Sequence, residues 1–181
     1  MNKFPTKQEL SQATSKTITD LLQSNLKLLF CGINPGLYSA YTGYHFARPG
    51  NRFWKAIYKA GFTPKLLHPS EQKELLQYGY GITNIVDRPS VSAAELTIHE
   101  YVEGGKRLQK KLLEFKPQWV AFVGIEAYRK AFNKPKAKIG NQREQIQGVN
   151  VWVLPSPSGL NAHYSLDDLV GLFKELRLAV G

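Results

Sequence analysis

The chain has 181 residues, of which 43% are hydrophobic and 21% charged, and it contains one cysteine. This length suits a single domain, and the composition is ordinary for a soluble globular protein and argues against disorder. One cysteine excludes an internal disulfide and any four-thiolate cluster. With 24 Lys and Arg against 14 Asp and Glu, the net charge of +10 favours a polyanionic partner such as nucleic acid.

Membrane insertion, secretion and metal binding find no support in the sequence. No stretch approaches the roughly 18 apolar residues of a membrane span, and residues 1–25 lack the apolar core of a signal peptide. We therefore expect a cytoplasmic protein, and its compact length favours a bacterial one. The four histidines lie far apart and without paired-ligand spacing, so we expect no metal and no cofactor.

In chain order, residues 1–25 are predicted to form a weakly helical or partly ordered leader, and residues 26–181 a single domain. Short apolar runs predict strands at 26–33, 81–86, 119–123 and 149–154. Helical spacing of apolar residues predicts helices at 52–60, 70–78 (capped by Ser70), 98–115, 126–132 and 166–180 (capped by Ser165). Residues 34–51 are expected to form a long loop. This alternation predicts an α/β fold with a mostly parallel sheet.

Two loops that follow predicted strands are the candidates for a ligand site. In parallel sheets, ligands bind outside the carboxyl ends of the strands. The first loop begins as Gly32–Leu37 (GINPGL), and the second is Pro155–Leu160 (PSPSGL). Because both loops would emerge at the same edge of the sheet, one cleft could use both.

The first loop offers an amide but no strong base. No carboxylate lies between Asn34 and Asn51, so the loop can orient a water or hydrogen-bond a carbonyl-bearing ring, but cannot supply a strong general base. Four aromatic residues of this loop are available to stack on such a ring: Tyr38, Tyr41, Tyr44 and Phe46. The alternative is structural, with Asn34-Pro35-Gly36 forming a β-turn and the aromatic rings packing on the core.

The second loop combines small polar residues with one leucine. An exposed leucine on a stiff loop can insert between bases, and Ser156 and Ser158 can hold phosphates. The alternative is a proline-stiffened connection with Leu160 packed inward.

Taken together, the sequence resembles the mismatch-specific uracil/thymine-DNA glycosylases, the double-strand-specific branch of the uracil-DNA glycosylase superfamily. The resemblance runs from about Leu26 to Leu178. Its segments are CGINPGL (31–37), PGNRFWK (49–55), GITNIVDRP (81–89), EGGKRL (103–108) and VLPSPSGL (153–160). It implies a three-layer α/β/α fold around a mostly parallel sheet of four to five strands.

The resemblance also implies roles for individual residues. Asn34 matches the asparagine that positions the attacking water, the Ile33 backbone meets the extruded base, and Phe46 stacks on that base. Ser39 helps decide whether a thymine methyl fits, and Asn84 stands where branches of the family carry lysine or asparagine. The implied base pocket comprises Ile33, Pro35, Gly36, Ser39, His45, Phe46 and Asn84. The implied DNA-binding wedge comprises Ser156, Ser158, Gly159, Leu160 and Asn161.

The activity that the resemblance implies is that of a monofunctional, monomeric DNA repair glycosylase, associated with the bacterial nucleoid while it acts on DNA. It would flip uracil, thymine or etheno-cytosine out of G·U or G·T mismatched double-stranded DNA and hydrolyse the N-glycosidic bond, leaving an abasic site. Two departures bear on specificity: Ser156 replaces an asparagine of bacterial relatives, and the stretch after Leu160 lacks the arginine that often follows the wedge. We therefore predict uracil excision broader than that of a strict G·U enzyme.

Two other readings of the sequence are a non-catalytic reader of damaged DNA with the same fold and a hydrolase of free nucleotides. Individual residues also have structural interpretations. Trp54 is expected in the core, Cys31 in a buried strand, and Arg88 paired with Asp87 or a helix end. His45 is expected either against the flipped nucleotide or in solvent. The lysines at 106, 110 and 111 are expected on a solvated helix face.

Overall fold

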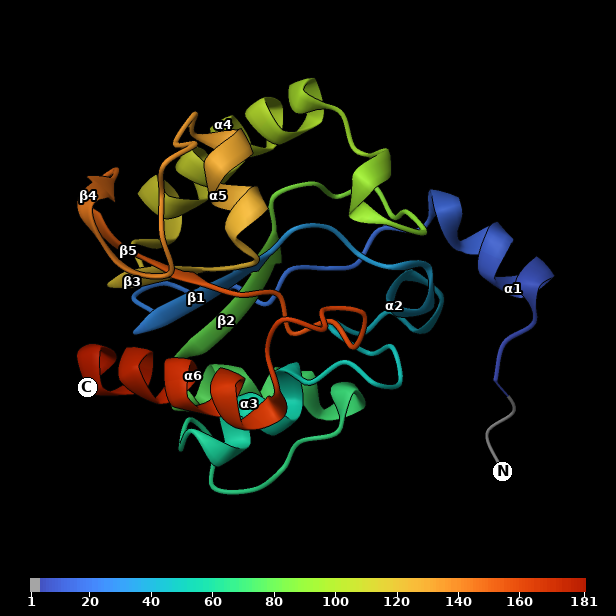
Figure 1. The fold of residues 1–181 in the computed structure, drawn as a ribbon, viewed down its shortest axis with the longest axis horizontal. Helices are drawn as coiled ribbons and strands as arrows, with labels where there is room; N and C mark the ends of the chain where they lie inside the picture. The colour runs from blue at the N-terminus through green and yellow to red at the C-terminus, as the bar shows by residue number, and fades with distance from the viewer. Residues whose placement is uncertain (1–3) are drawn as a thin grey trace.

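The computed structural model describes residues 4–181, which form a five-stranded sheet between two layers of helices (Figure 1). The strands are β1 (Leu28–Gly32), β2 (Tyr80–Asn84), β3 (Trp119–Val123), β4 (Gly140–Ile146) and β5 (Val149–Leu154). They lie in the order β2-β1-β3-β5-β4, and all neighbours are parallel except β4, which runs antiparallel to β5. This confirms the predicted three-layer α/β fold.

Helices cover both faces of the sheet, with α4 and α5 on one side and α3 and α6 on the other (Figure 1). The helices are α1 (Lys7–Gln12), α2 (Leu37–Thr42), α3 (Phe53–Lys59), α4 (Ile98–Phe115), α5 (Ile125–Ala131) and α6 (Leu166–Val180). Three 3₁₀ segments, η1 (Ala13–Ser15), η2 (Pro69–Tyr78) and η3 (Ala93–Glu95), complete the secondary structure of the described residues.

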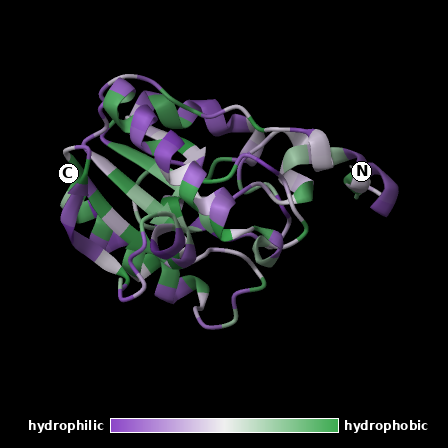
Figure 2. Ribbon diagram, turned by 90° about the horizontal axis from the view of Figure 1, so that it is seen from above, coloured by the Kyte–Doolittle hydropathy of each residue, from purple (hydrophilic) through white to green (hydrophobic). Residues whose placement is uncertain are grey.

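Two apolar cores form because alternate strand residues point to opposite faces of the sheet. In β1, Leu28 and Phe30 pack toward α3 and α6, whereas Leu29 and Cys31 pack toward α4 and α5. Every residue of β1 is buried, as expected for a central parallel strand covered on both sides. Figure 2 shows the same pattern, with hydrophobic strands inside and hydrophilic positions spread over the outer helices.

The long helices begin and end where the sequence predicts. Thr97 and Glu100 form a capping box at the start of α4, and Ser165 caps α6 by accepting from the Asp168 backbone. Trp54 and Cys31 are buried, as expected. The predicted bounds of α4 and α6 are confirmed, and both helices have regular apolar spacing and a capped N-terminus.

Three local predictions were wrong. Residues 34–51 are not all loop, because they contain α2. The segment 69–78 is a 3₁₀ helix whose cap is His68 rather than Ser70. Strand β4 was missed, since most of its side chains are polar and exposed at the edge of the sheet and give no apolar run.

The N-terminal segment packs against the free edge of β2. Leu21 pairs with Ile82 through two backbone hydrogen bonds of 2.8 and 3.1 Å. Asp20 forms an ion pair of 2.6 Å with Lys111, so Lys111 is half-buried and was wrongly placed on a solvated face. Helix α1 lies beside α2, away from the sheet (Figure 1). Within residues 4–181, no helix has the length and apolar character needed to cross a membrane.

Candidate active site

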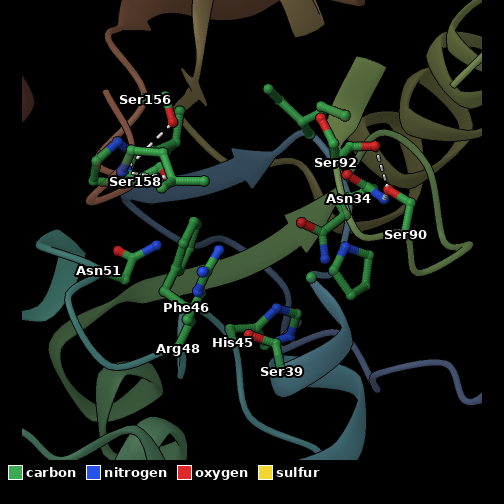
Figure 3. A pocket seen from close by; sticks show the side chains of 18 of the residues that line it. Asn34, Ser39, His45, Phe46, Arg48, Asn51, Ser90, Ser92, Ser156 and Ser158 are labelled. Atoms are coloured by element: carbon green, nitrogen blue, oxygen red, sulfur yellow. Dashed lines mark hydrogen bonds between the residues drawn. The ribbon is translucent and has the colours of Figure 1, made fainter. Parts of the chain in front are cut away.

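A cavity of about 400 Å³ opens at the carboxyl edge of the sheet. The loops after β1, β2 and β5 form its walls (Figure 3). Twelve of the thirteen sequence-predicted site residues line it: Ile33, Asn34, Pro35, Gly36, Ser39, His45, Phe46, Asn84, Ser156, Ser158, Leu160 and Asn161. The two loops singled out from the sequence therefore do meet at one site.

Gly159 is the predicted site residue that does not line the cavity. It packs against the chain at Gly50, where an added Cβ would lie 2.7 Å from the Gly50 backbone oxygen. This close approach explains why a glycine stands immediately before Leu160.

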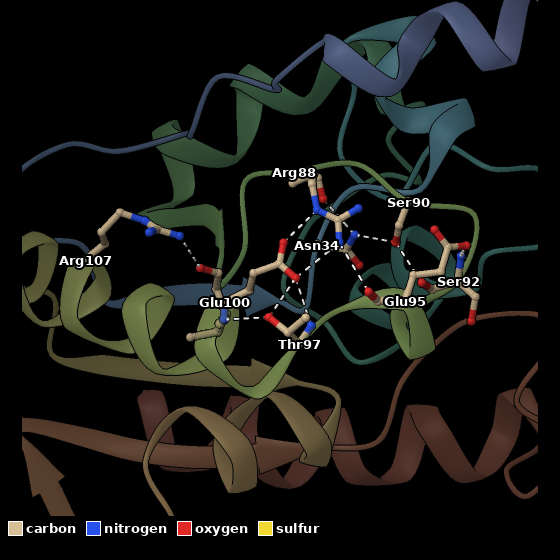
Figure 4. Close-up of polar contacts among 9 residues, drawn as sticks. Asn34, Arg88, Ser90, Ser92, Glu95, Thr97, Glu100 and Arg107 are labelled. Carbon is tan, nitrogen blue, oxygen red and sulfur yellow. Dashed lines mark hydrogen bonds and ion pairs between the residues drawn. The ribbon is translucent and has the colours of Figure 1, made fainter.

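The side chain of Asn34 is held by two hydrogen bonds from its amide nitrogen. Nδ2 donates to the backbone oxygen of Arg88 at 2.9 Å and to Ser90 Oγ at 2.8 Å (Figure 4). The Arg88 oxygen can only accept, so it fixes which end of the amide carries the nitrogen. Both amide hydrogens are thereby used, and Oδ1 makes no hydrogen bond within residues 4–181. Asn34 thus presents an acceptor with a fixed orientation.

Phe46 forms a flat wall of the cavity. Its ring stacks on Phe53 with centroids 4.0 Å apart, and its backbone has a positive φ of 52°. The flanking amides are satisfied, since His45 N donates to Gln72 Oε1 at 2.8 Å and Ala47 N to Ser39 Oγ at 3.1 Å. The N–H of Phe46 itself has no acceptor among the described residues.

Asn84 places a second amide in the cavity at the end of β2. Asn84 is only 9% exposed, and its amide makes no hydrogen bond within residues 4–181. No unpaired side-chain polar atom of the described residues is fully buried, so the Asn84 amide opens onto the cavity, where water or a ligand can satisfy it. Gly32 makes room for it, because a Cβ at that position would lie 2.5 Å from Asn84 Oδ1. Asn84 is therefore free to hydrogen-bond a ligand.

His45 is buried rather than solvent-exposed, and it lines the cavity. Its side chain is 2% exposed, and its Nε2 lies 3.0 Å from the backbone oxygen of Thr19, to which it must donate. Burial lowers the pKa of His45 below its usual 6.5, so the ring is neutral at pH 7. The donated Nε2 hydrogen leaves Nδ1 as the acceptor of this neutral ring.

The wedge loop, residues 156–161, is held by an arginine that the sequence analysis did not single out. The guanidinium of Arg52 donates to the backbone oxygens of Pro157 at 3.3 Å, Ser158 at 2.7 Å and Asn161 at 3.0 Å, and also to that of Tyr164. Leu160 is 76% exposed on this loop, so its side chain points outward rather than into the core. The hydrogen bonds from Arg52 thus hold the backbone of a loop that exposes Leu160.

The two serines of the wedge loop are engaged within the loop itself. Ser156 Oγ accepts from the Ser158 backbone at 3.3 Å, and Ser158 Oγ accepts from the Leu160 backbone at 3.2 Å. The side-chain amide of Asn161 donates to the backbone oxygen of Ser156 at 3.0 Å. Each hydroxyl keeps its own hydrogen for a phosphate oxygen.

Other residues line the cavity without having been predicted: Ile18, Arg48, Asn51, Ser90, Val91, Ser92, Ala93, Val123 and Pro157. Arg48 was the one detectable from the sequence, since it is a cation inside the glycine-rich loop. Of the four loop aromatics, only Phe46 lines the cavity; Tyr38 packs on Phe4 with centroids 5.2 Å apart, and Tyr41 lies below Lys16. Thus Tyr38 and Tyr41 contact the N-terminal segment, and Tyr44 does not line the cavity either.

Arg88 supports the site from behind. Its guanidinium pairs with Glu100 at the start of α4, with Nε 2.6 Å from Oε1 and Nη2 3.2 Å from Oε2 (Figure 4). This pair and the Thr97 cap hold the pKa of Glu100 down at about 2. The expected pairing of Arg88 with a helix end is confirmed, whereas Asp87 pairs with Arg107 at 3.6 Å.

The chemistry open to the cavity is limited by its side chains. No carboxylate, thiol or lysine in the described chain lines it, and its ionisable groups are Arg48 and the neutral His45. Within residues 4–181, no three His, Cys, Asp or Glu side chains gather as metal ligands. The cavity can therefore hydrogen-bond a ligand or a water through its amides and stack a ring on Phe46, but its lining supplies no strong general base.

Comparison with known proteins identifies the family. The family model of the Uracil DNA glycosylase superfamily matches residues 19–177, and the chain therefore belongs to this superfamily. Membership implies a DNA glycosylase, a hydrolase of N-glycosyl bonds that acts in DNA repair. The predicted superfamily is thus confirmed, and the mismatch-specific branch stays a prediction.

The fold is also similar to a solved structure. The solution NMR structure of a protein from Methanosarcina acetivorans, described as a "putative Uracil DNA glycosylase", aligns with a TM-score of 0.57 and 20% sequence identity. The alignment covers 90% of this chain and 98% of that one. At this identity, the comparison supports the fold.

Proposed function

We propose that this protein excises uracil from double-stranded DNA, with preference for uracil opposite guanine, by extruding the nucleotide into the cavity and hydrolysing its N-glycosidic bond. The observation that carries the proposal is the orientation of Asn34. Its nitrogen is fully used by Arg88 and Ser90, so its oxygen is left to accept a hydrogen bond from a water. The product is an abasic site and free uracil.

Water is positioned rather than deprotonated in this mechanism. An amide oxygen accepts a hydrogen bond but is far too weak a base to take a proton at neutral pH. The glycosidic bond therefore breaks ahead of water attack: the bonding electrons leave with the base, and the sugar becomes cationic at C1′. The Asn34-bound water then adds to C1′, and its proton is released to solvent or to the departing uracil anion.

The leaving base needs stabilisation of its negative charge. We assign this role to the N–H of Phe46, which has no acceptor among residues 4–181, and to the amide of Asn84, which lines the cavity, while the Phe46 ring stacks on the base. Fixed donors aimed at a developing anion lower the barrier without needing to reorganise.

Mismatch preference is expected from the cost of extrusion. Removing a base from the stack costs a few kcal/mol, and less for a wobble pair than for a matched pair. Exposed Leu160, held by the Arg52-anchored loop, would fill the gap left in the duplex. The net charge of +10 supports binding to the phosphates, with affinity that falls as salt rises.

Hydrolysis is proposed as the only reaction at the site. A glycosylase that also cleaves the strand needs an amine nucleophile to form a Schiff base with the sugar. In the described part of the chain, no lysine lines the cavity. This supports a monofunctional enzyme, which we further propose to act as a cytoplasmic monomer.

The decisive experiment compares uracil release from G·U duplex, A·U duplex and single-stranded DNA, read as alkali-labile cleavage of a labelled strand. G·T and etheno-cytosine duplexes are tested in parallel. We expect the fastest release from G·U, with measurable release from A·U and single strands, because Ser156 and the missing arginine after Leu160 weaken the dependence on the opposite guanine. Release from G·U alone would disprove the broader range.

The Asn34→Ala variant separates catalysis from binding. We expect it to lose at least about a hundredfold in single-turnover rate, as for removal of a charge-stabilising or positioning group. Its affinity for a duplex with an abasic analogue should stay within about twofold of the wild type. Equal loss of rate and affinity would mean that Asn34 is structural, and binding without release by the wild type would indicate a non-catalytic reader.

A further inference from the structure

A second exposed apolar side chain stands at the mouth of the cavity. Val91 lines the cavity and is 72% exposed, close to the 76% of Leu160. The flanking Ser90 and Ser92 lie on one side of the cavity, and Ser156 and Ser158, which precede Leu160, lie on the other (Figure 3). Leu160 and Val91 are therefore carried by loops on opposite sides of the same opening.

The loop that carries Val91 is as firmly held as the wedge loop. The Ser90 backbone donates to the Pro35 oxygen at 3.2 Å, and the Ser90 hydroxyl donates to the Ser92 oxygen at 2.8 Å. Ser92 in turn caps η3 by accepting from the Ala94 backbone at 3.2 Å. An apolar side chain held out into solvent on a fixed backbone gains free energy only when a partner covers it.

This loop is also bonded directly to the proposed water-positioning residue. Ser90, next to Val91 in the chain, is one of the two acceptors of Asn34 Nδ2. A ligand that contacts Val91 therefore touches the residue next to Ser90, whose hydroxyl orients Asn34.

We propose that residues 89–93 form a second DNA-contacting lip, in which Val91 packs against the base stack on the side of the extruded nucleotide opposite Leu160. The inference rests on the proposed function, because its occupant is the strand that carries the extruded nucleotide. The two apolar tips hold the neighbouring bases apart from both sides. The same lip carries Ser90, which already holds the Asn34 amide before DNA binds.

The test compares Val91→Ala and Leu160→Ala with Leu178→Ala, which truncates an equally exposed residue (76%) on α6 outside the cavity. The first readout is binding to a G·U duplex whose uracil nucleotide is 2′-fluorinated and resists cleavage, with 2-aminopurine placed 5′ or 3′ to the uracil. The second is the single-turnover release of uracil from G·U duplex and from a single strand of the same sequence.

We expect Val91→Ala to lower uracil release from the duplex roughly fivefold, because two buried carbons are removed from the contact. Release from the single strand should change less than twofold. The fluorescence increase of 2-aminopurine should fall on one side of the uracil in Val91→Ala and on the other side in Leu160→Ala. Val91→Leu should restore both readouts, and Leu178→Ala should match the wild type.

The outcomes distinguish this inference from the proposed function. Absence of uracil release by the wild type from every DNA would refute the proposed function itself. Normal release and fluorescence in Val91→Ala, alongside a clear defect in Leu160→Ala, would overturn the second lip alone. Equal losses on duplex and single strand in Val91→Ala would also overturn it, since a contact with the base stack requires a duplex.

Discussion

The hydrogen bond between Asn34 Nδ2 and Ser90 Oγ, 2.8 Å long, has a fixed direction. The Ser90 hydroxyl spends its one hydrogen on the backbone oxygen of Ser92, also at 2.8 Å, so its oxygen can only accept from Asn34. Ser90 thereby holds the Asn34 amide in the orientation that turns its oxygen to the cavity. The positioning of a water would depend on a residue that never touches it.

Replacing Ser90 by alanine should therefore impair catalysis more than binding. The Asn34 amide keeps its bond to Arg88 but loses the second one, which corresponds to roughly a tenfold fall in single-turnover rate. Affinity for a duplex with an abasic analogue should change less than twofold. Ser24→Ala is the control, because Ser24 is exposed and does not line the cavity. A normal rate in Ser90→Ala would mean that Arg88 alone orients Asn34.

Gly32→Ala should displace the Asn84 side chain in the base pocket, because Gly32 lies beside it in the sheet. The added methyl would lie 2.5 Å from Asn84 Oδ1 and 3.3 Å from Phe46 Cζ, so Asn84 must move. We expect at least a tenfold loss of uracil release and a destabilisation of about 1–3 kcal/mol, measured by denaturant unfolding. Gly171→Ala in α6, whose Cβ meets nothing within 4 Å, should be neutral or stabilising. Wild-type activity in Gly32→Ala would show that Asn84 does not read the base.

Arg52→Ala should loosen the wedge loop. Losing charged hydrogen bonds to the Pro157, Ser158 and Asn161 oxygens should lower release from G·U duplex at least about tenfold, and release from single strands much less. Arg52→Lys should not restore activity, since an ammonium lacks the planar fork. Arg177→Ala removes a similar contact, 3.2 Å to the Gly61 oxygen, far from the cavity and serves as control. Equal defects on both substrates would contradict a role in the wedge.

Folding stability should fall with acidification because of His45. Burial holds its pKa below 6.5 in the folded chain, so above pH 6.5 the ring is neutral in both folded and unfolded states. Below pH 6.5 the unfolded chain takes up a proton that the folded chain refuses, and the free energy of unfolding drops by at most ~1.4 kcal/mol per pH unit. Urea unfolding at pH 7, 6 and 5 should show this slope reduced in His45→Asn; an unchanged slope would mean that other groups cause it.

The sequence alone predicted four of the five strands and both long helices, because short apolar runs, helical spacing and the Ser165 cap mark those elements locally. The individual site residues came from the resemblance to the glycosylases, and twelve of them line the cavity. The sequence pattern missed β4, whose edge position lets polar residues pair. It also missed Ser90 and Arg52, which act through partners 56 and about 110 positions away that no local pattern connects.

Because every bond from the Arg52 guanidinium ends on a backbone oxygen, the anchor is indifferent to which side chains residues 157–164 carry. Exposed side chains of the wedge loop can therefore be substituted while the hydrogen bonds from Arg52 remain. Libraries at positions 160, 162 and 163, which keep the loop-bracing side chain of Asn161, are a direct route to glycosylases with altered preference for the base left behind in the opposite strand.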